Sequence, residues 1–158
     1  IDIFWRDRKS IKGFDYWVTY SYIDTERKYR NFPEQATPDF ISDHTFSVVG
    51  KYWVYAINTQ VGASFTTASG RPYDDPNSPA FMEEQTKMYS DLSLNFSHIF
   101  YIGNQYSVLY FSVNNVLGND AVLSYRPTGI ADSEGNYNLI PVKRDLKRFA
   151  FIGLFLNF

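Results

Sequence analysis

The end of the chain is the feature that most restricts its fold. Residues 147–158 read Lys-Arg-Phe-Ala-Phe-Ile-Gly-Leu-Phe-Leu-Asn-Phe, which is almost wholly apolar and ends on an aromatic residue. Alternate positions form one continuous apolar row: Ala150, Ile152, Leu154, Leu156 and Phe158. A period of two indicates a strand with one apolar face, as in the wall of a membrane β-barrel. A buried C-terminal strand of a soluble β-sandwich would have the same pattern, so both interpretations stay open here.

The composition also favours alternating strands. Aromatic residues make up 19% of the chain, with 13 Tyr, 14 Phe and 3 Trp, yet the mean hydropathy is −0.32. A helix that spans a bilayer needs about 18 or more consecutive apolar residues, and no such run is present. A chain can combine many aromatic residues with a low mean hydropathy if apolar and polar residues alternate along its strands. An aromatic-rich soluble β protein would share this composition.

Seven strands are predicted from the alternation. The segment from Gly13 to Thr25 shows it best, because its apolar row faces a second row that contains Asp15, Thr19 and Ser21. Its alternating interior has about the ten residues that a tilted strand needs to cross a bilayer. The predicted strands are residues 1–6, 13–25, 43–53, 57–66, 87–101, 105–116 and 147–158.

The connections between these strands alternate in length. Residues 7–12, 54–56 and 102–104 are short turns, whereas 26–41, 69–86 and 117–145 are long and polar. Residues 121–125 are expected to continue the preceding hairpin beyond the main strand. Short periplasmic turns opposite long extracellular loops characterise outer-membrane barrels. An aromatic belt is expected at the short-turn level, formed by Phe14, Tyr16, Tyr52, Trp53, Phe100, Tyr101, Tyr106 and Phe158.

The predicted fold is all-β, an antiparallel up-and-down meander of about seven to eight strands that forms part of a larger transmembrane β-barrel. Single-chain bacterial barrels have an even number of strands and begin at eight, so seven strands would not close. The residues Gly153, Leu156 and Phe158 are similar to the C-terminal assembly signal of outer-membrane barrels, glycine-x-x-apolar-x-aromatic. Phe151 departs from that signal, which usually has a polar residue two positions before the glycine.

The whole chain, residues 1–158, resembles the C-terminal barrel portion of TonB-dependent outer-membrane receptors, particularly those of the Bacteroidetes group. The resemblance rests on residues 4–7 (Phe-Trp-Arg-Asp), 14–25, 38–40 with His44, 69–73 (Ser-Gly-Arg-Pro-Tyr), 111–116 with Tyr125, and 153–158. It implies a barrel of about 22 strands with a plug in its lumen. The plug, the TonB-contacting segment and the earlier strands would lie outside these residues.

This resemblance implies a function in transport. The chain would wall the lumen of a receptor in the outer membrane of a Gram-negative bacterium, one that imports a siderophore, cobalamin or glycan. Its partners would be outer-membrane lipid, the rest of the barrel and plug, the TonB complex and the barrel-assembly machinery. No enzyme activity and no cofactor are expected. The alternative is a small soluble or surface β-barrel that binds a ligand.

Candidate binding residues lie in the long connections, because binding residues favour loops on a rigid wall. Arg71, Tyr73, Arg126 and Tyr137 are the candidate ligand-facing residues. A net charge of −2 argues against nucleic acid as a partner. Without cysteine or a histidine pair at ligand spacing, no zinc site is expected.

Three further groups have alternative interpretations. His44 could serve a lipase of the outer membrane, but a histidine at a strand end is far commoner. Acidic and amide side chains at 74–77 and 132–136 could bind calcium, although solvated carboxylates are the usual finding. The cations Lys143, Arg144, Lys147 and Arg148 could pair with lipopolysaccharide phosphates.

Overall fold

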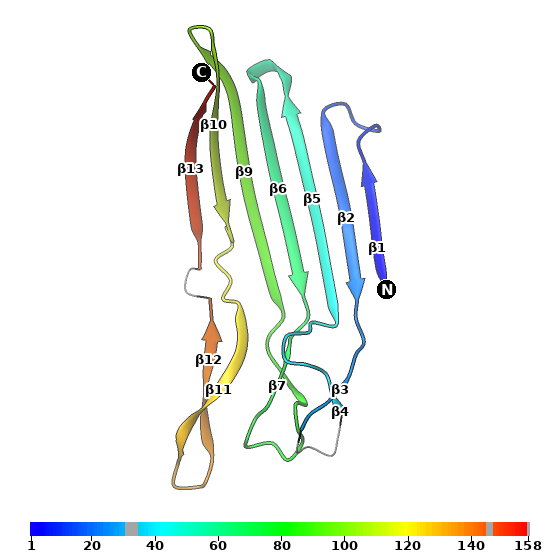
Figure 1. Cartoon of the computed structure of the whole chain (residues 1–158), viewed down its shortest axis with the longest axis vertical. Coiled ribbons are helices and arrows are strands. Elements are labelled where there is room, and N and C mark those ends of the chain that lie inside the picture. Colours follow the sequence, from blue (N-terminus) through cyan, green and yellow to red (C-terminus); the bar gives the residue numbers. More distant parts are fainter. Residues whose placement is uncertain (31–34, 145–146, 158) are drawn as a thin grey trace.

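The protein forms one large antiparallel sheet. The computed structural model describes residues 1–30, 35–144 and 147–157. Seven strands lie side by side in the order β1-β2-β5-β6-β9-β10-β13, which is also their order in the sequence (Figure 1). Their bounds are β1 Asp2–Asp7, β2 Phe14–Tyr22, β5 His44–Val54, β6 Thr59–Ala68, β9 Tyr89–Ile102, β10 Gln105–Asn114 and β13 Phe149–Leu156. The predicted all-β meander is confirmed, and the described strands form an open sheet.

Each of the three long connections contains a two-stranded hairpin. β3 (Arg27–Lys28) pairs with β4 (Gln35–Ala36), and β7 (Pro72–Tyr73) pairs with β8 (Glu84–Gln85). The third hairpin is much larger and consists of β11 (Val122–Ala131) and β12 (Tyr137–Lys143). The sequence predicted strand only for residues 121–125, so most of this hairpin was missed. Figure 1 shows all three hairpins beyond the same end of the main sheet.

The short turns lie at the opposite end of the sheet. β5 and β6 are joined by the short 3-10 helix η1 (Tyr55–Ile57) and by Asn58, which has a left-handed φ of 47°. Between β9 and β10 only two residues intervene, and Gly103 supplies the positive φ of 62° that so tight a hairpin requires. The alternation of short and long connections predicted from the sequence is therefore confirmed.

The two faces of the sheet differ in chemistry. Register pairing brings the apolar rows of successive strands onto one side, the apolar face. Across its middle, Val18 lies beside Val48, Val48 beside Phe65, and Phe65 beside Leu92. The row continues at the other edge through Phe111 and Ile152. On the other side, the polar face, Thr19 pairs with Ser47, Ser47 with Thr66 and Thr66 with Asp91.

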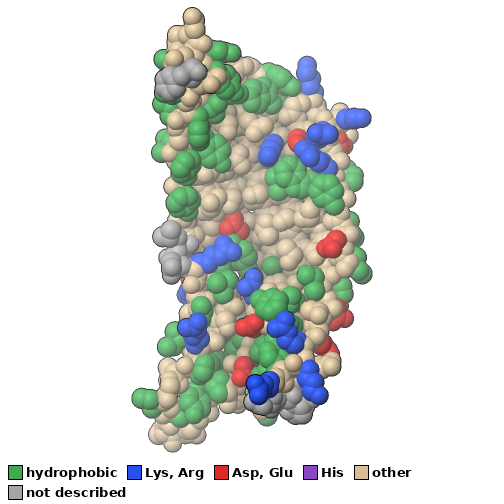
Figure 2. All heavy atoms as spheres, viewed as in Figure 1, with side chains coloured by type: hydrophobic (Ala, Val, Ile, Leu, Met, Phe, Trp, Pro, Cys, Tyr) green, Lys and Arg blue, Asp and Glu red, His purple; other side chains and the backbone are tan. Residues whose placement is uncertain are grey.

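Figure 2 shows the polar face. Polar side chains and backbone cover the middle of the sheet in this view. Neither histidine is visible there, because His44 pairs with Tyr22 and His98 with Leu109 on the apolar face. On this face Asp15 of β2 lies beside Lys51 of β5 and accepts a hydrogen bond of 2.8 Å from Arg6 of β1.

No second layer of described residues covers the apolar face. Among the described residues, the buried apolar side chains are Ala121, at 7% exposure, and the two prolines Pro38 and Pro72, and none of the three lies in the main sheet. Side chains in the middle of the apolar face remain open, with Phe111 at 43% and Ile152 at 70% exposure. A soluble domain of this size would bury such residues in a core. The described residues therefore form a wall with one uncovered apolar side.

The predicted aromatic belt is only partly correct. Phe14 and Tyr52 are cross-strand partners on the apolar face, with ring centroids 6.3 Å apart, and Phe14 stacks on Tyr16 at 4.9 Å. Trp53, however, follows Tyr52 and points to the polar face because side chains alternate along a strand. Tyr101 and Tyr106 pair on the polar face too. Phe158 lies outside the described residues.

Candidate ligand-facing surface

The long connections contact one another at their end of the sheet. Tyr29 in the first connection meets Phe81 in the second edge-on, at a ring distance of 5.2 Å. Tyr73 of β7 contacts Tyr125 of β11 at 4.7 Å. These contacts join segments far apart in sequence, so the three connections form one surface above the wall.

The side chain of Asn77 binds the backbone of the largest hairpin, which consists of β11 and β12. The amide of Asn77 donates a hydrogen bond of 2.9 Å to the Tyr137 carbonyl and accepts one of 2.7 Å from the Tyr137 amide. Both bonds link the second connection to the start of β12. Together with the contact between Tyr73 and Tyr125, they attach β11 and β12 to the second connection at two positions.

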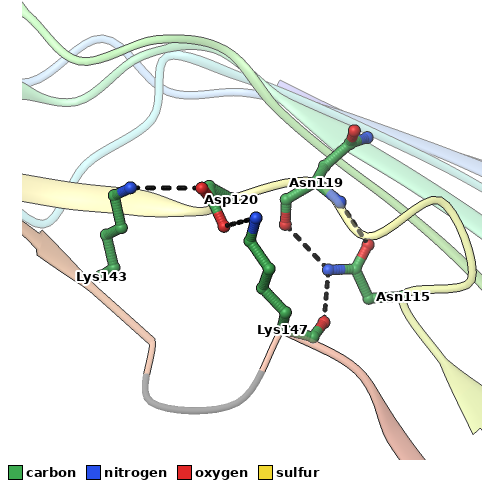
Figure 3. Close-up of polar contacts among 5 residues, drawn as sticks. All are labelled: Asn115, Asn119, Asp120, Lys143 and Lys147. Atoms are coloured by element: carbon green, nitrogen blue, oxygen red, sulfur yellow. Dashed lines mark hydrogen bonds and ion pairs between the residues drawn. The ribbon is translucent and has the colours of Figure 1, made fainter.

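A second group of polar contacts, here called the asparagine clamp, joins β10 to β13. It consists of Asn115, Asn119, Asp120, Lys143 and Lys147 (Figure 3). The Asn115 amide nitrogen donates to the carbonyls of Asn119 at 2.8 Å and Lys147 at 2.7 Å, while its oxygen accepts from the Asn119 amide at 3.2 Å. Asp120 forms ion pairs with Lys143 at 3.2 Å and Lys147 at 2.9 Å. The clamp thus fixes where the hairpin leaves the wall.

Beside the clamp the polar face is hollowed. Two adjoining depressions share Ser42, Ala68, Arg71, Tyr89 and Arg144 as lining residues, and together they are called the arginine hollow. The larger one, of about 320 Å³, extends over Thr45 and Thr66 of the sheet to Phe40 and Ile41 of the first connection. Its floor is the polar face and its rim comes from the long connections.

Tyr89 and Arg144 form the best-defined polar contact of this hollow. The Arg144 guanidinium lies 5.0 Å from the centre of the Tyr89 ring, and its Nη1 donates a hydrogen bond of 3.1 Å to the Tyr89 hydroxyl. That hydroxyl donates in turn to Asp91 at 2.7 Å, and Asp91 also accepts from Ser93 at 2.6 Å. The chain of bonds orients Arg144 and leaves most of its five N–H donors available.

The four candidate ligand-facing residues have different environments. Arg71 lines the arginine hollow. Tyr73 is packed against Tyr125, and burial, followed by the nearby Glu84 and Asp75 carboxylates, raises the pKa of its hydroxyl. Arg126 is exposed on β11, away from the hollow, and the backbone of Tyr137 is held by Asn77. The structure therefore brings only Arg71 to this cavity.

Sequence reasoning missed Tyr89, Asn115 and Asn119. Tyr89 has the same strand parity as Asp91 and Ser93, so its position on the polar face could have been inferred from alternation. Asn115 has a left-handed φ of 52° directly after β10, and asparagine tolerates that conformation better than most residues. Its role as a clamp depends on Lys147, which no local pattern connects to it.

The residues of the suggested assembly signal lie at the free edge of the sheet. Gly153 and Leu156 belong to β13, where they pair with Tyr110 and Ser107 of β10. Phe158 lies outside the described part of the chain. The signal itself stays a prediction.

The two histidines belong to aromatic clusters on the apolar face. His44 bonds through Nδ1 to the Tyr20 hydroxyl at 2.8 Å and lies 5.0 Å from the Tyr22 ring. His98 bonds through Nδ1 to the Thr59 hydroxyl at 2.8 Å and stacks on Phe100. These contacts suit a histidine at a strand end, the commoner alternative.

The acidic groups considered for calcium organise turns. Asp75 accepts the Asn77 amide at 2.9 Å, and Asp132 accepts the amides of Glu134 and Asn136, both at 2.9 Å. In the described ranges, no three His, Cys, Asp or Glu residues gather as a metal site. Of the four cations considered for lipopolysaccharide, Lys143 and Lys147 pair with Asp120, and Arg144 donates to the Tyr89 hydroxyl. Binding of lipopolysaccharide phosphates by this group stays a prediction.

Within residues 1–30, 35–144 and 147–157, no helix is long and apolar enough to cross a membrane. Comparison of the chain with protein-family models, with curated proteins and with solved structures gives no match.

Proposed function

We propose that this chain is a section of the wall of a transmembrane β-barrel in the outer membrane of a Gram-negative bacterium. The observation that carries the proposal is the uncovered apolar face. Exposed apolar patches of more than a few hundred Å² mark a surface that contacts lipid or a partner, and here the patch crosses all seven strands of one sheet. Lipid is the occupant that suits a face without charged side chains at its centre.

The dimensions of the sheet support this assignment. Transmembrane strands need about 9 to 11 residues when tilted, and β5, β6 and β10 have 11, 10 and 10 residues. Aromatic side chains flank the apolar face at both ends, with Phe14, Tyr16 and Tyr52 at one end and Tyr20 and Tyr22 at the other. Aromatic girdles of this kind mark the two membrane interfaces.

We further propose that the complete protein is a TonB-dependent receptor that imports a scarce solute. In that assembly the polar face lines the lumen, the long connections face the exterior, and the arginine hollow lies at the outer mouth. The barrel remainder, the plug and the TonB complex are partners that lie outside these residues. The receptor assignment predicts a plug and about fifteen further strands encoded upstream of Ile1; an unrelated domain there would contradict it.

A matched pair of substitutions tests the membrane assignment. Ala63 lies near the middle of β6 on the apolar face, between Gly50 and Leu94, and the next residue, Ser64, lies on the polar face. Arginine on the lipid side near the bilayer midplane costs about 2–4 kcal/mol. Ala63→Arg should therefore lower the free energy of unfolding of the chain in lipid vesicles by that amount, while Ser64→Arg should have little effect.

Urea titration followed by tryptophan fluorescence measures both variants. Equal losses in the two variants would contradict a lipid-facing and a lumen-facing side. A monodisperse folded wild-type chain without detergent would instead favour the soluble binding module.

A further inference from the structure

We propose that the arginine hollow binds the anionic group, a carboxylate or phosphate, of a small soluble ligand that also carries an apolar part. The geometry that points to this is the position of Arg71 and Arg144 on one cavity between the polar face and the long connections. Binding here does not require that the chain spans a membrane. Two further steps rest on the proposed function: that the ligand is dissolved and not a lipid, and that it is the imported solute.

The charge of the hollow has one sign. Arg71, Lys87 and Arg144 line its two depressions, and within the described part of the chain no Asp or Glu lines either one. Asp91 and Asp120 lie in the neighbouring cavity of about 170 Å³, where Tyr89, Ser93 and the two lysines of the clamp already engage them. A cavity with cations and without their counterions attracts an anion.

The guanidinium groups of Arg71 and Arg144 have N–H donors available for a ligand. Arg71 is half-buried, and among the described residues its side chain has no hydrogen-bond or ion-pair partner. Arg144 uses one hydrogen bond to the Tyr89 hydroxyl, which also fixes the guanidinium above the ring. Two planar guanidinium groups can each bind a carboxylate or phosphate through parallel N–H donors.

The other residues that line the arginine hollow determine which chemical groups the rest of the ligand can carry. Ile23, Phe40 and Ile41 supply an apolar wall, and the hydroxyls of Thr45 and Thr66 lie on the floor. Phe40 is 55% exposed and Ile23 is 43% exposed, so both offer contact area to a ligand. Figure 2 shows the same mixture, with Lys and Arg side chains among hydrophobic ones below the polar middle of the sheet.

The position of the hollow on the polar face indicates whether its anion belongs to a dissolved molecule or to a lipid. Thr45, Thr66 and Tyr89 place the hollow on the polar face, opposite the side where lipid would lie. A phosphate of a membrane-anchored lipid would have to reach around the wall to enter it. The ligand is therefore a dissolved molecule.

The test uses phenyl phosphate as the probe and the full 158-residue chain folded in detergent. Phenyl phosphate combines the anion with an apolar ring, and benzyl alcohol serves as the neutral analogue. Calorimetric titration should show saturable binding of phenyl phosphate that weakens as salt is raised. Loss of a charge-assisted hydrogen bond should weaken binding about tenfold or more in Arg71→Gln and in Arg144→Gln.

Matched variants separate the hollow from general charge. Arg126→Gln removes the same charge from an exposed site on β11 and should leave binding unchanged. Arg144→Lys keeps the charge but loses the planar donor pair, so it should bind more weakly than wild type and better than Arg144→Gln. Because Arg144 also contacts Tyr89, Arg71→Gln is the variant that tests binding without loss of an internal contact.

Several results would overturn the proposal. They are absence of saturable binding at millimolar phenyl phosphate, equal binding of benzyl alcohol, and equal weakening by Arg126→Gln. A fourth is binding of lipopolysaccharide that depends on Arg71 and is tighter than that of phenyl phosphate, since the anion would then come from the membrane. All four can be observed whether or not the Ala63→Arg test supports a lipid-facing wall.

Discussion

At the scale of single residues, Asn115 shows how a polar side chain can substitute for a core. It is 8% exposed and adopts a left-handed φ of 52° after the last residue of β10. Its amide contacts the Asn119 backbone and the Lys147 carbonyl. Because the described residues of the seven main strands include no buried apolar side chain, the connections depend on such polar contacts to hold their positions.

Asn115→Ala should destabilise the folded chain by about 2 kcal/mol or more, because the Asn119 amide and two carbonyls lose a partner in a buried position. Alanine also tolerates a positive φ poorly. The neighbouring Asn114 is the control, since it is exposed and its side chain has no hydrogen-bond partner within the described residues. Urea unfolding of both variants in the same detergent checks this; a loss in Asn114→Ala as large as in Asn115→Ala would show that the clamp contributes nothing.

Tyr73 gives a prediction for pH. Burial and the nearby carboxylates raise the pKa of its hydroxyl in the folded protein above the ordinary value of 10.0. The neutral phenol therefore stabilises the folded state below pH 10, and this contribution is lost as pH rises through the higher folded pKa. The contact with Tyr125 should loosen above pH 10 in wild type and persist in Tyr73→Phe, as followed by near-ultraviolet circular dichroism.

At the scale of elements, the hairpin of β11 and β12 is attached to the second connection rather than to the sheet. Asn77 holds the backbone of Tyr137 by two hydrogen bonds, and Tyr73 packs on Tyr125. Asn77→Ala should therefore speed amide hydrogen exchange in β11 and β12 and leave β9 and β10 protected. Asp74→Ala changes an exposed side chain three residues earlier and should alter neither. Faster exchange throughout the sheet in Asn77→Ala would indicate that the hairpin belongs to the same cooperative unit.

The sequence predicted the long strands well because one simple rule governs them. Most apolar side chains of β2, β5, β6 and β9 lie on one face, with exceptions such as Trp17 and Val49, so alternation marks the strand and its register. The hairpin of β11 and β12 breaks this rule, since Pro127 and Pro141 interrupt its alternation and a register shift lies between Pro127 and Ala131. Its position depends on contacts with residues about fifty or sixty places away, as between Asn77 and Tyr137, which local patterns do not contain.

At the scale of the whole molecule, the sheet has two unsatisfied edges. Figure 1 shows β1 and β13 at its margins, and in the described chain each pairs on one side only. Open edges present rows of unpaired N–H and C=O groups that bind further strands. In a complete barrel these rows would pair with strands outside this chain, as the proposed wall requires. The chain by itself should pair its edges with those of other copies.

Proline substitutions in β13 can test its free edge and its edge paired with β10 independently. Asn157 donates its amide to the Tyr106 carbonyl at 3.1 Å. The antiparallel alternation then directs the Gly153 amide toward β10 and the Ile152 amide toward the free edge. Ile152→Pro should therefore spare the existing ladder and block a further strand, since edge strands tolerate proline where the N–H faces outward. Gly153→Pro removes a hydrogen bond to β10 and should destabilise the sheet itself.

Analytical ultracentrifugation of the chain in detergent is the measurement. We expect concentration-dependent association of the wild type that Ile152→Pro reduces, with the free energy of unfolding largely kept. The same substitution in a complete barrel should lower the yield of assembled protein in the membrane, because β13 could no longer pair with the strand that closes the wall. Two results would contradict this: a wild type that is monomeric at all concentrations, or association that Ile152→Pro leaves unchanged. Either would mean that the free edge of β13 does not pair with another strand.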